Sequence, residues 1–271
     1  MRHADDSRKF PRFDVAVAGM LACMLLGGCA PDLTARMLTE GWQQLQANQP
    51  ERALTTAENV LTELPPGSSR AAEALYLKGR ALEARPAANP QEQRNHLTNA
   101  FAAYTAALSR SPRPPLEGRI YAGLGNVCYW LDDYTSAWRN WATAYDLTDD
   151  VPAKAFVLYR IGLCQQRLGR FAEADRTFAA VQQEFAGTDA AQRARQKQGI
   201  RTFAVQVATF ANAQSAENAM NTLRREGYVP TRTSNASGQS VVSISPFADY
   251  QQARNARDRL AGLFPDALVI P

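Results

Sequence analysis

The side chains with the greatest potential for chemistry in this 271-residue chain are four cysteines and two histidines. Four cysteines are too few to build a disulfide scaffold in a chain of this length. His3 and His96 cannot supply the three nearby ligands that are usual for a zinc site. The sequence contains no G-x-S-x-G motif, no phosphate-binding loop, no H-E-x-x-H motif and no pair of buried-looking acids at matched spacing. We therefore expect a protein that is not an enzyme, with no catalytic residue, metal or cofactor.

Cys29 stands directly behind an apolar segment near the start of the chain. Residues 1–14 include four basic side chains, and Val15–Leu26 is an unbroken apolar run. These twelve residues are too few to span a bilayer, but they suit the hydrophobic region of a signal peptide. The run ends in Leu-Gly-Gly-Cys, which resembles the lipobox of bacterial lipoproteins.

The lipobox resemblance implies that residues 1–28 are a signal peptide and that Cys29 carries acyl chains such as palmitate. Residues 29–32 would then form a lipidated tether. Several acyl chains at one end of a protein give stable membrane anchoring. Ala30, and not aspartate, follows the cysteine, which favours the outer membrane facing the periplasm over the inner membrane. An ordinary secretory signal or an uncleaved anchor is the alternative.

Between residues 33 and 198, small residues recur at a spacing typical of helical hairpins. The two clearest copies place glycine and alanine twelve residues apart, at Gly125/Ala137 and Gly162/Ala174. Two weaker copies precede them, at Gly41/Ala53 and Gly79/Ala100. Two antiparallel helices touch at such positions, so only a small side chain fits there. The pattern predicts four helix-turn-helix units, with Arg85–Gln93 as an inserted loop in the second.

These units resemble the tetratricopeptide repeat (TPR). The resemblance implies an α-solenoid whose concave face binds an extended segment of a protein partner that the sequence does not identify. Trp130, Trp138 and Trp141 either line that groove or belong to the core, and their helical spacing favours the core. Cys128 and Cys164 fall at nearly equivalent positions on the first helices of the third and fourth repeats. We expect two buried thiols there, with a disulfide as the alternative.

After Gly199 the pattern changes to a duplicated strand-helix unit. Residues 205–223 match residues 242–260 at eight positions when shifted by 37. Each copy begins with an alternating strand and continues into an amphipathic helix, and Asn212 is placed to cap the first helix. Two further strands are expected at 228–233 and 267–270. The predicted order is βαββαβ, a ferredoxin-like antiparallel sheet with both helices on one face and the other face open.

Residues 200–271 resemble the SPOR domain. The resemblance depends on three segments, Val205-Gln206-Val207-Ala208-Thr209-Phe210, Gly227-Tyr228 and Ser245-Pro246-Phe247. It implies binding to peptidoglycan glycan strands, with preference for strands stripped of stem peptides. Gln206 matches the glutamine typical of the family's first strand, whereas Val241 and Ser243 replace the arginine common around the third strand.

Alternation along the two long strands divides their side chains between the faces of the sheet. If Val205, Val207, Val242 and Ile244 point toward the helices, a second set lies on the open face: Gln206, Ala208, Val241, Ser243 and Ser245. The amide of Gln206 both donates and accepts hydrogen bonds, as sugar hydroxyl and acetamido groups require. We expect glycan binding by Gln206, Thr209, Ser243 and Ser245, and a solvated sheet face is the alternative.

The charge balance does not indicate nucleic acid as a partner. Thirty Lys and Arg against 26 Asp and Glu leave a net charge of +4, which is too small to favour nucleic acid by itself. RNA-binding βαββαβ domains carry an aromatic pair on the central strands, where this chain has Ala208 and Ser243.

Taken together, the lipobox-like segment, the repeats and the SPOR resemblance predict an envelope lipoprotein of cell division or wall remodelling. The alternative is an outer-membrane assembly or secretion scaffold in which the repeats are the functional part.

Overall fold

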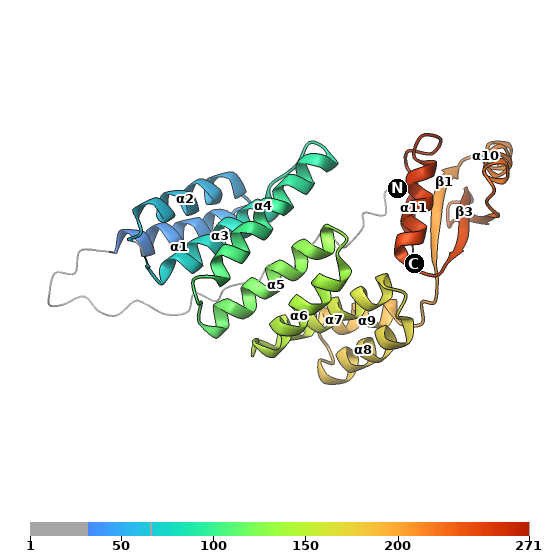
Figure 1. Cartoon of the computed structure of the whole chain (residues 1–271). Helices are drawn as coiled ribbons and strands as arrows, with labels where there is room; N and C mark the ends of the chain where they lie inside the picture. Colours follow the sequence, from blue (N-terminus) through green and yellow to red (C-terminus); the bar gives the residue numbers. More distant parts are fainter. Residues whose placement is uncertain (1–31, 66, 271) are drawn as a thin grey trace. The chain divides into compact units, whose positions relative to one another are not determined.

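The computed structural model of this chain describes residues 32–65 and 67–270 (Figure 1). The predicted signal peptide at 1–28 and the predicted lipidation site at Cys29 lie outside these described residues. The described chain divides into two compact units. One contains the residues before 132 together with 143–153, and the other contains 132–142 together with 154 onward. Helices α6 and α7 run through both.

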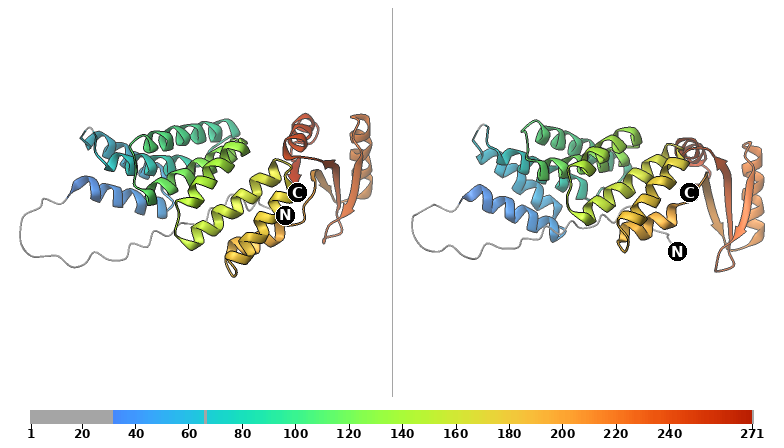
Figure 2. Two further views of the ribbon diagram at one scale, coloured as in Figure 1. Left: turned by 60° about the horizontal axis from the view of Figure 1, so that its bottom comes forward. Right: turned by 90° about the horizontal axis from the view of Figure 1, so that it is seen from below.

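Residues 32–65 and 67–198 form nine helices in succession (Figures 1 and 2). They are α1 (Leu33–Gln46), α2 (Pro50–Glu63), α3 (Arg70–Ala84), α4 (Pro90–Leu108), α5 (Pro114–Trp130), α6 (Tyr134–Asp146), α7 (Val151–Arg167), α8 (Phe171–Glu184) and α9 (Asp189–Lys197). In the first unit, successive helices from α1 to α5 pack on one another, as a solenoid of helix pairs requires. The predicted helical repeat array is confirmed.

The repeat glycines accommodate large rings in two of the helix pairs. A Cβ on Gly162 would lie 2.5 Å from a ring carbon of Phe178, and a Cβ on Gly79 would overlap the ring of Tyr104. Phe178 and Tyr104 are both fully buried. Each glycine therefore lets a ring from the second helix of the pair lie against the backbone of the first helix.

The second repeat departs from the predicted inserted loop at Arg85–Gln93. Only residues 85–89 link the helices, because α4 already begins at Pro90. Proline suits the first position of a helix, and the preceding Asn89 side chain accepts a hydrogen bond from the Glu92 backbone N–H at 2.9 Å. The extra residues therefore lengthen α4, which has 19 residues. The predicted loop was right for residues 85–89 and wrong for residues 90–93, which are helical.

The ninth helix was not predicted as a separate element. The Thr188 hydroxyl caps α9 by accepting a hydrogen bond from the Ala191 N–H at 3.2 Å. Ala190, Ala191 and Ala194 are buried, since α9 packs on α8. The capping threonine with an acidic residue directly after it is the sequence signal that predicts this start.

The remaining chain forms a four-stranded antiparallel sheet and two helices. The elements are β1 (Phe203–Phe210), α10 (Ala213–Arg225), β2 (Pro230–Ser234), β3 (Ser240–Phe247), α11 (Tyr250–Leu260) and β4 (Leu268–Ile270). The strand order is β2-β3-β1-β4, so the two copies of the duplicated unit place their strands side by side in the centre. The predicted βαββαβ order is confirmed, including the Asn212 cap of α10.

One hydrophobic core holds both helices against the sheet. Val205, Val207, Val242 and Ile244 are at most 1% exposed. Three side chains of each helix are buried, namely Ala216, Ala219 and Leu223 of α10 and Ala253, Ala256 and Leu260 of α11, and all of these except Ala219 belong to the same core cluster as the four strand residues. These six are equivalent across the 37-residue duplication, so the repeated sequence forms a repeated half-core and leaves one face of the sheet uncovered.

The expected core positions of the repeats are also borne out in part. Trp141 is 1% exposed and therefore belongs to the core, while Trp130 and Trp138 are half-buried. Cys128 and Cys164 are both buried, as expected.

Across residues 32–65 and 67–270, no helix has the length and apolar character needed to cross a bilayer. The same residues contain no cluster of His, Cys, Asp or Glu suited to a metal ion.

Candidate functional site

The open face of the sheet is built from one row of opposed side chains across all four strands. Gln206 on β1 pairs with Ser243 on β3 and with Leu268 on β4, and Ser243 also pairs with Thr231 on β2. Directly opposed residues of antiparallel strands point to the same face. The register therefore brings Gln206 and Ser243 together, as predicted from alternation.

The pairing of β1 with β3 is interrupted at Val207. Gln206 pairs with Ser243 and Ala208 pairs with Val242, so β1 advances by two residues where β3 advances by one. A bulge of this kind reverses the order of inward and outward side chains that follow it. Ala208 is thus set opposite the fully buried Val242, and its predicted place on the open face is wrong.

The same bulge determines the position of Thr209. This residue pairs with Val241 and is exposed, whereas Phe210 packs against the core. In a regular strand, residues three apart lie on opposite faces. Here the Gln206 Nε2 donates a hydrogen bond to Thr209 Oγ1 at 3.5 Å. Gln206 and Thr209 therefore form one polar pair on the open face.

Ser245 lies at a second irregularity. Phe203 and Val205 of β1 are two residues apart in the sequence, but their partners on β3, Phe247 and Ile244, are three residues apart. Ser245 falls inside this interval and is half-buried, with no partner in the ladder between β1 and β3. It therefore sits beside the row of Gln206 and Ser243 and does not belong to it.

The sequence did not predict several residues of this face, among them two threonines of β2 and the leucine of β4, and also Ala204 and Ile270. Thr231 and Thr233 of β2 stand opposite Ser243 and Val241, and Leu268 of β4 is 50% exposed beside Gln206. Thr231 Oγ1 also donates to the Ser243 carbonyl at 3.4 Å. The alternation of threonines around Arg232 was a signal for β2, but the register that aligns them is not visible in the sequence.

The described open face carries no charged side chain. Arg232 stands opposite the buried Val242 and therefore belongs to the helix side of β2. The paired residues facing outward are Thr231, Thr233, Val241, Ser243, Gln206, Thr209, Ala204, Leu268 and Ile270. Amide and hydroxyl groups next to small apolar side chains can form hydrogen bonds with a neutral polyhydroxylated ligand and contact its C–H surfaces.

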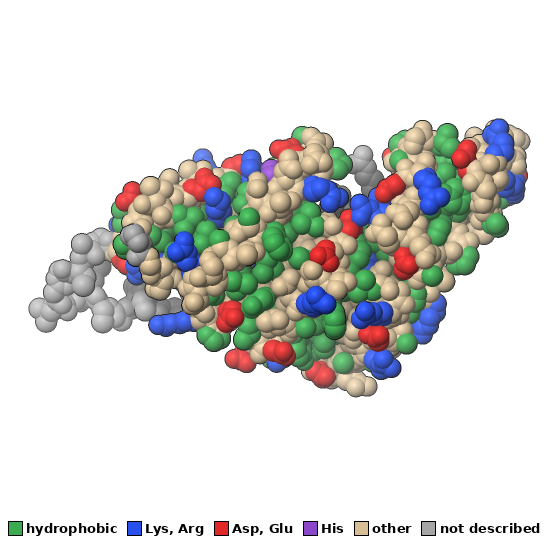
Figure 3. Space-filling view, in the orientation of Figure 1, with side chains coloured by type: hydrophobic (Ala, Val, Ile, Leu, Met, Phe, Trp, Pro, Cys, Tyr) green, Lys and Arg blue, Asp and Glu red, His purple; other side chains and the backbone are tan. Residues whose placement is uncertain are grey.

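Within the first unit, three aromatic rings and two carboxylates form a mostly buried cluster inside the repeats. The rings of Trp42, Tyr76 and Tyr104 follow one another at centroid distances of 5.4 and 5.8 Å. Trp42 is half-buried, and its Nε1 donates to Glu73 at 3.3 Å. Burial, and next the Glu83 carboxylate, raise the pKa of Tyr104 well above 10, so this hydroxyl stays protonated and donates to Glu83. Figure 3 shows basic and acidic side chains interspersed on the face in view, with no extended patch of one sign.

Comparison with known proteins gives a family match for the last part of the chain. Residues 199–271 match the SPOR domain family. A crystal structure of a thermophilic TPR protein from Thermus thermophilus is similar to this chain at 18% sequence identity and a TM-score of 0.40, covering 60% of this chain and 98% of that one. No curated protein matches the chain. The helical region is followed by a segment that matches the SPOR domain family, and this match implies peptidoglycan binding.

Proposed function

We propose that this chain is a non-enzymatic cell-envelope lipoprotein that binds peptidoglycan glycan strands on the open face of its SPOR domain. The observation that carries the proposal is the uncharged row of Gln206, Ser243 and Thr231, continued by Thr209. Glycan stripped of its peptides presents hydroxyl and acetamido groups, and amide and hydroxyl side chains can both donate hydrogen bonds to these groups and accept hydrogen bonds from them. Ser245 lies beside this row and adds a hydroxyl group that can form hydrogen bonds with the glycan.

The repeats bind a protein partner in this proposal, and Cys29 anchors the chain by lipid in the outer membrane facing the periplasm. Three contacts on one chain raise the effective concentration of each ligand for the others. The protein would in this way hold its partner at glycan exposed during cell division or wall remodelling. The lipobox-like sequence before Cys29 supports the anchor. Substitution of Cys29 by alanine should abolish labelling by a palmitate analogue and release the protein from the membrane fraction.

The glycan-binding proposal is tested by co-sedimentation of residues 30–271 with sacculi. Sacculi treated with an amidase, which removes the stem peptides, should retain more protein than untreated ones. Replacing Gln206 by alanine removes one or two neutral hydrogen bonds worth about 1 kcal/mol each, a loss of roughly fivefold to thirtyfold in affinity. Gln214→Ala is the matched control, because Gln214 is exposed on α10 and bonds only to Asn218 there.

Two outcomes would contradict the proposal. Equal loss of binding in both variants would show that the open face is not the site, and equal retention by treated and untreated sacculi would remove the preference for bare glycan. Localisation of a fluorescent fusion addresses the cellular role. We expect septal enrichment that is lost with Gln206→Ala and kept with Gln214→Ala.

A further inference from the structure

A cluster of aromatic rings joins the SPOR domain to the helices that precede it in the second unit. Tyr250, the first residue of α11, packs edge-on against Tyr134 of α6 at a centroid distance of 5.6 Å and against Phe203 of β1 at 5.7 Å. Phe203 in turn lies 5.9 Å from Phe171 of α8. The guanidinium carbon of Arg167, at the end of α7, stands 3.6 Å above the Tyr250 ring. Aromatic contacts of these kinds stabilise beyond the area that they bury.

Some of these side chains are also part of the SPOR core itself. Phe203 is 3% exposed and belongs to the same cluster as Val205 and Leu223. Phe171 lies on a repeat helix, yet it packs against that cluster. The helical region therefore contributes a side chain to the core of the domain that follows it, which an independently folded domain on a tether would not require.

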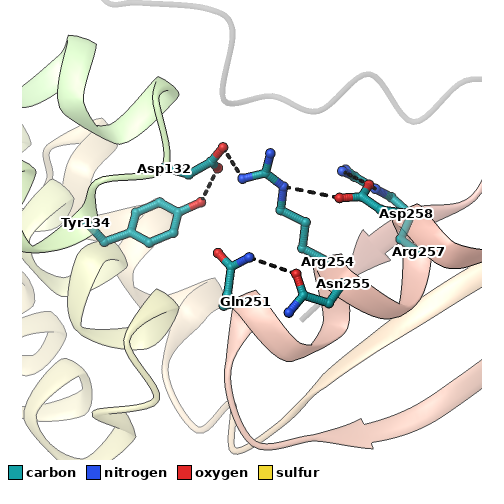
Figure 4. Close-up of polar contacts among 7 residues, drawn as sticks. All are labelled: Asp132, Tyr134, Gln251, Arg254, Asn255, Arg257 and Asp258. Carbon is teal, nitrogen blue, oxygen red and sulfur yellow. Dashed lines mark hydrogen bonds and ion pairs between the residues drawn. The ribbon is translucent and has the colours of Figure 1, made fainter.

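A polar contact borders the aromatic cluster (Figure 4). Asp132 lies in the turn between α5 and α6 with a φ of 67°, a left-handed conformation that aspartate tolerates. Its carboxylate accepts a hydrogen bond from the Tyr134 hydroxyl at 2.7 Å and forms an ion pair with Arg254 of α11. Arg254 also lies 3.7 Å from Asp258. Only about a fifth of the Asp132 and Arg254 side chains is exposed, so water screens this pair less than a surface pair.

The segment between α9 and β1 is held as well. The Gly199 N–H donates to the Asp175 carboxylate at 2.8 Å, and the Arg201 guanidinium pairs with the same carboxylate at 2.6 Å. At the turn before α8, a Cβ on Gly169 would lie 3.2 Å from the Ala248 carbonyl oxygen, so the two backbones approach closely there. The covalent linker between α9 and β1, the contacts of Asp175 and the close approach of Gly169 to Ala248 all restrict movement of the SPOR domain relative to α8.

We propose that residues 132–142 and 154–270 form one cooperative body, in which the last repeat helices complete the SPOR core and cover one face of α11. The SPOR domain is then not a module on a free tether. The repeat helices hold its open face in one orientation, and the covered face of α11 is closed to other partners. This inference depends on the packing alone and not on the identity of the ligand.

Two matched glycine substitutions test the close backbone approach. Gly169 and Gly187 both follow helices with left-handed φ values, 74° and 83°, which asparagine tolerates. A Cβ on Gly169 meets Ala248, whereas a Cβ on Gly187 meets nothing within 4 Å. In residues 30–271, limited trypsin digestion after Arg201 should be about tenfold faster in Gly169→Asn, corresponding to about 1.4 kcal/mol of lost docking. Gly187→Asn should be cut at the unmodified rate.

A second pair tests the ion pair and remains informative if Gly169→Asn does not fold. Arg254→Gln removes the contact with Asp132, whereas Arg257→Gln removes only a contact with the neighbouring Asp258. Cleavage after Arg201 should accelerate in Arg254→Gln alone. In the unmodified chain, amide ¹⁵N relaxation should give one rotational correlation time for residues 154–197 and 203–270. Separate correlation times, or equal cleavage rates within both pairs of variants, would overturn the proposal.

Discussion

Substitution of Gly79 by alanine should destabilise the repeats, although alanine is the better helix former by about 1 kcal/mol. A Cβ at this position would lie 2.6 and 2.8 Å from Cδ1 and Cζ of Tyr104, and closer still to Cε1. The Tyr104 ring cannot move away, because it is fully buried and its other edge lies against Gly123 of α5. Movement would also break the hydrogen bond from Tyr104 to Glu83.

The size of the effect follows from these opposing terms. Overpacking a core costs about 1–3 kcal/mol, and loss of a buried hydrogen bond to a carboxylate costs about 1.5–3 kcal/mol. After the gain in helix propensity, we expect a net loss of about 1.5–5 kcal/mol. For a unit of somewhat more than 100 residues, this corresponds to a fall in Tm of roughly 6–20 °C.

The assay is thermal and urea unfolding of residues 30–271, followed by circular dichroism, in a double-mutant cycle with Tyr104→Leu. The smaller leucine side chain removes the ring that the introduced methyl group would overlap. The cycle should therefore give a favourable coupling of at least about 1.5 kcal/mol between the two changes. An unchanged or raised Tm for Gly79→Ala alone, or additive effects in the cycle, would refute the packing argument.

Three further predictions concern stability. Burial raises the pKa of Tyr104 well above 10, so the repeats should keep their stability below pH 10 and lose it above, and the urea midpoint should fall less steeply with rising pH in Tyr104→Phe. Leu223→Ala should cost about 2–5 kcal/mol in denaturant unfolding because Leu223 is fully buried, whereas the exposed Leu263→Ala should change stability by less than about 0.5 kcal/mol. A hydrogen bond from Thr34, and then one from a backbone N–H, lower the pKa of Asp32 below 3.8. The protection of amides at the start of α1, measured as the exchange rate relative to the intrinsic rate at each pH, should therefore be greatest above pH 3.8 and fall as the pH drops through the lowered pKa, an effect that Asp32→Asn should remove.

Local sequence patterns were sufficient for the strands and helices of residues 200–271 but not for every side chain of the open face. The 37-residue duplication and the alternation around Val205 and Val242 predicted both strand-helix units, because each depends on short-range periodicity. The bulge at Val207 was not predictable, since it arises from how β1 and β3 pair. It explains both the wrong placement of Ala208 and the exposure of Thr209.

The helical region shows the same limit. The Gly–Ala spacing predicted where paired helices approach, because contact distance depends on side-chain size. It did not show that Gly79 and Gly162 receive rings, since the partner ring lies at a different sequence distance in each pair. The contact of Tyr250 with Tyr134 joins residues more than 100 positions apart, and no local pattern in the sequence indicated it.

The duplication also places its own equivalent residues opposite each other. Gln206 and Ser243 are related by the 37-residue shift and are direct partners in the antiparallel ladder, so an approximate two-fold axis passes between them. A face with full two-fold symmetry would hold a linear ligand equally well in either direction. The difference between an amide and a hydroxyl at this axis removes that equivalence. We therefore expect the face to distinguish the two ends of a bound strand, and a glycan chain has chemically different ends.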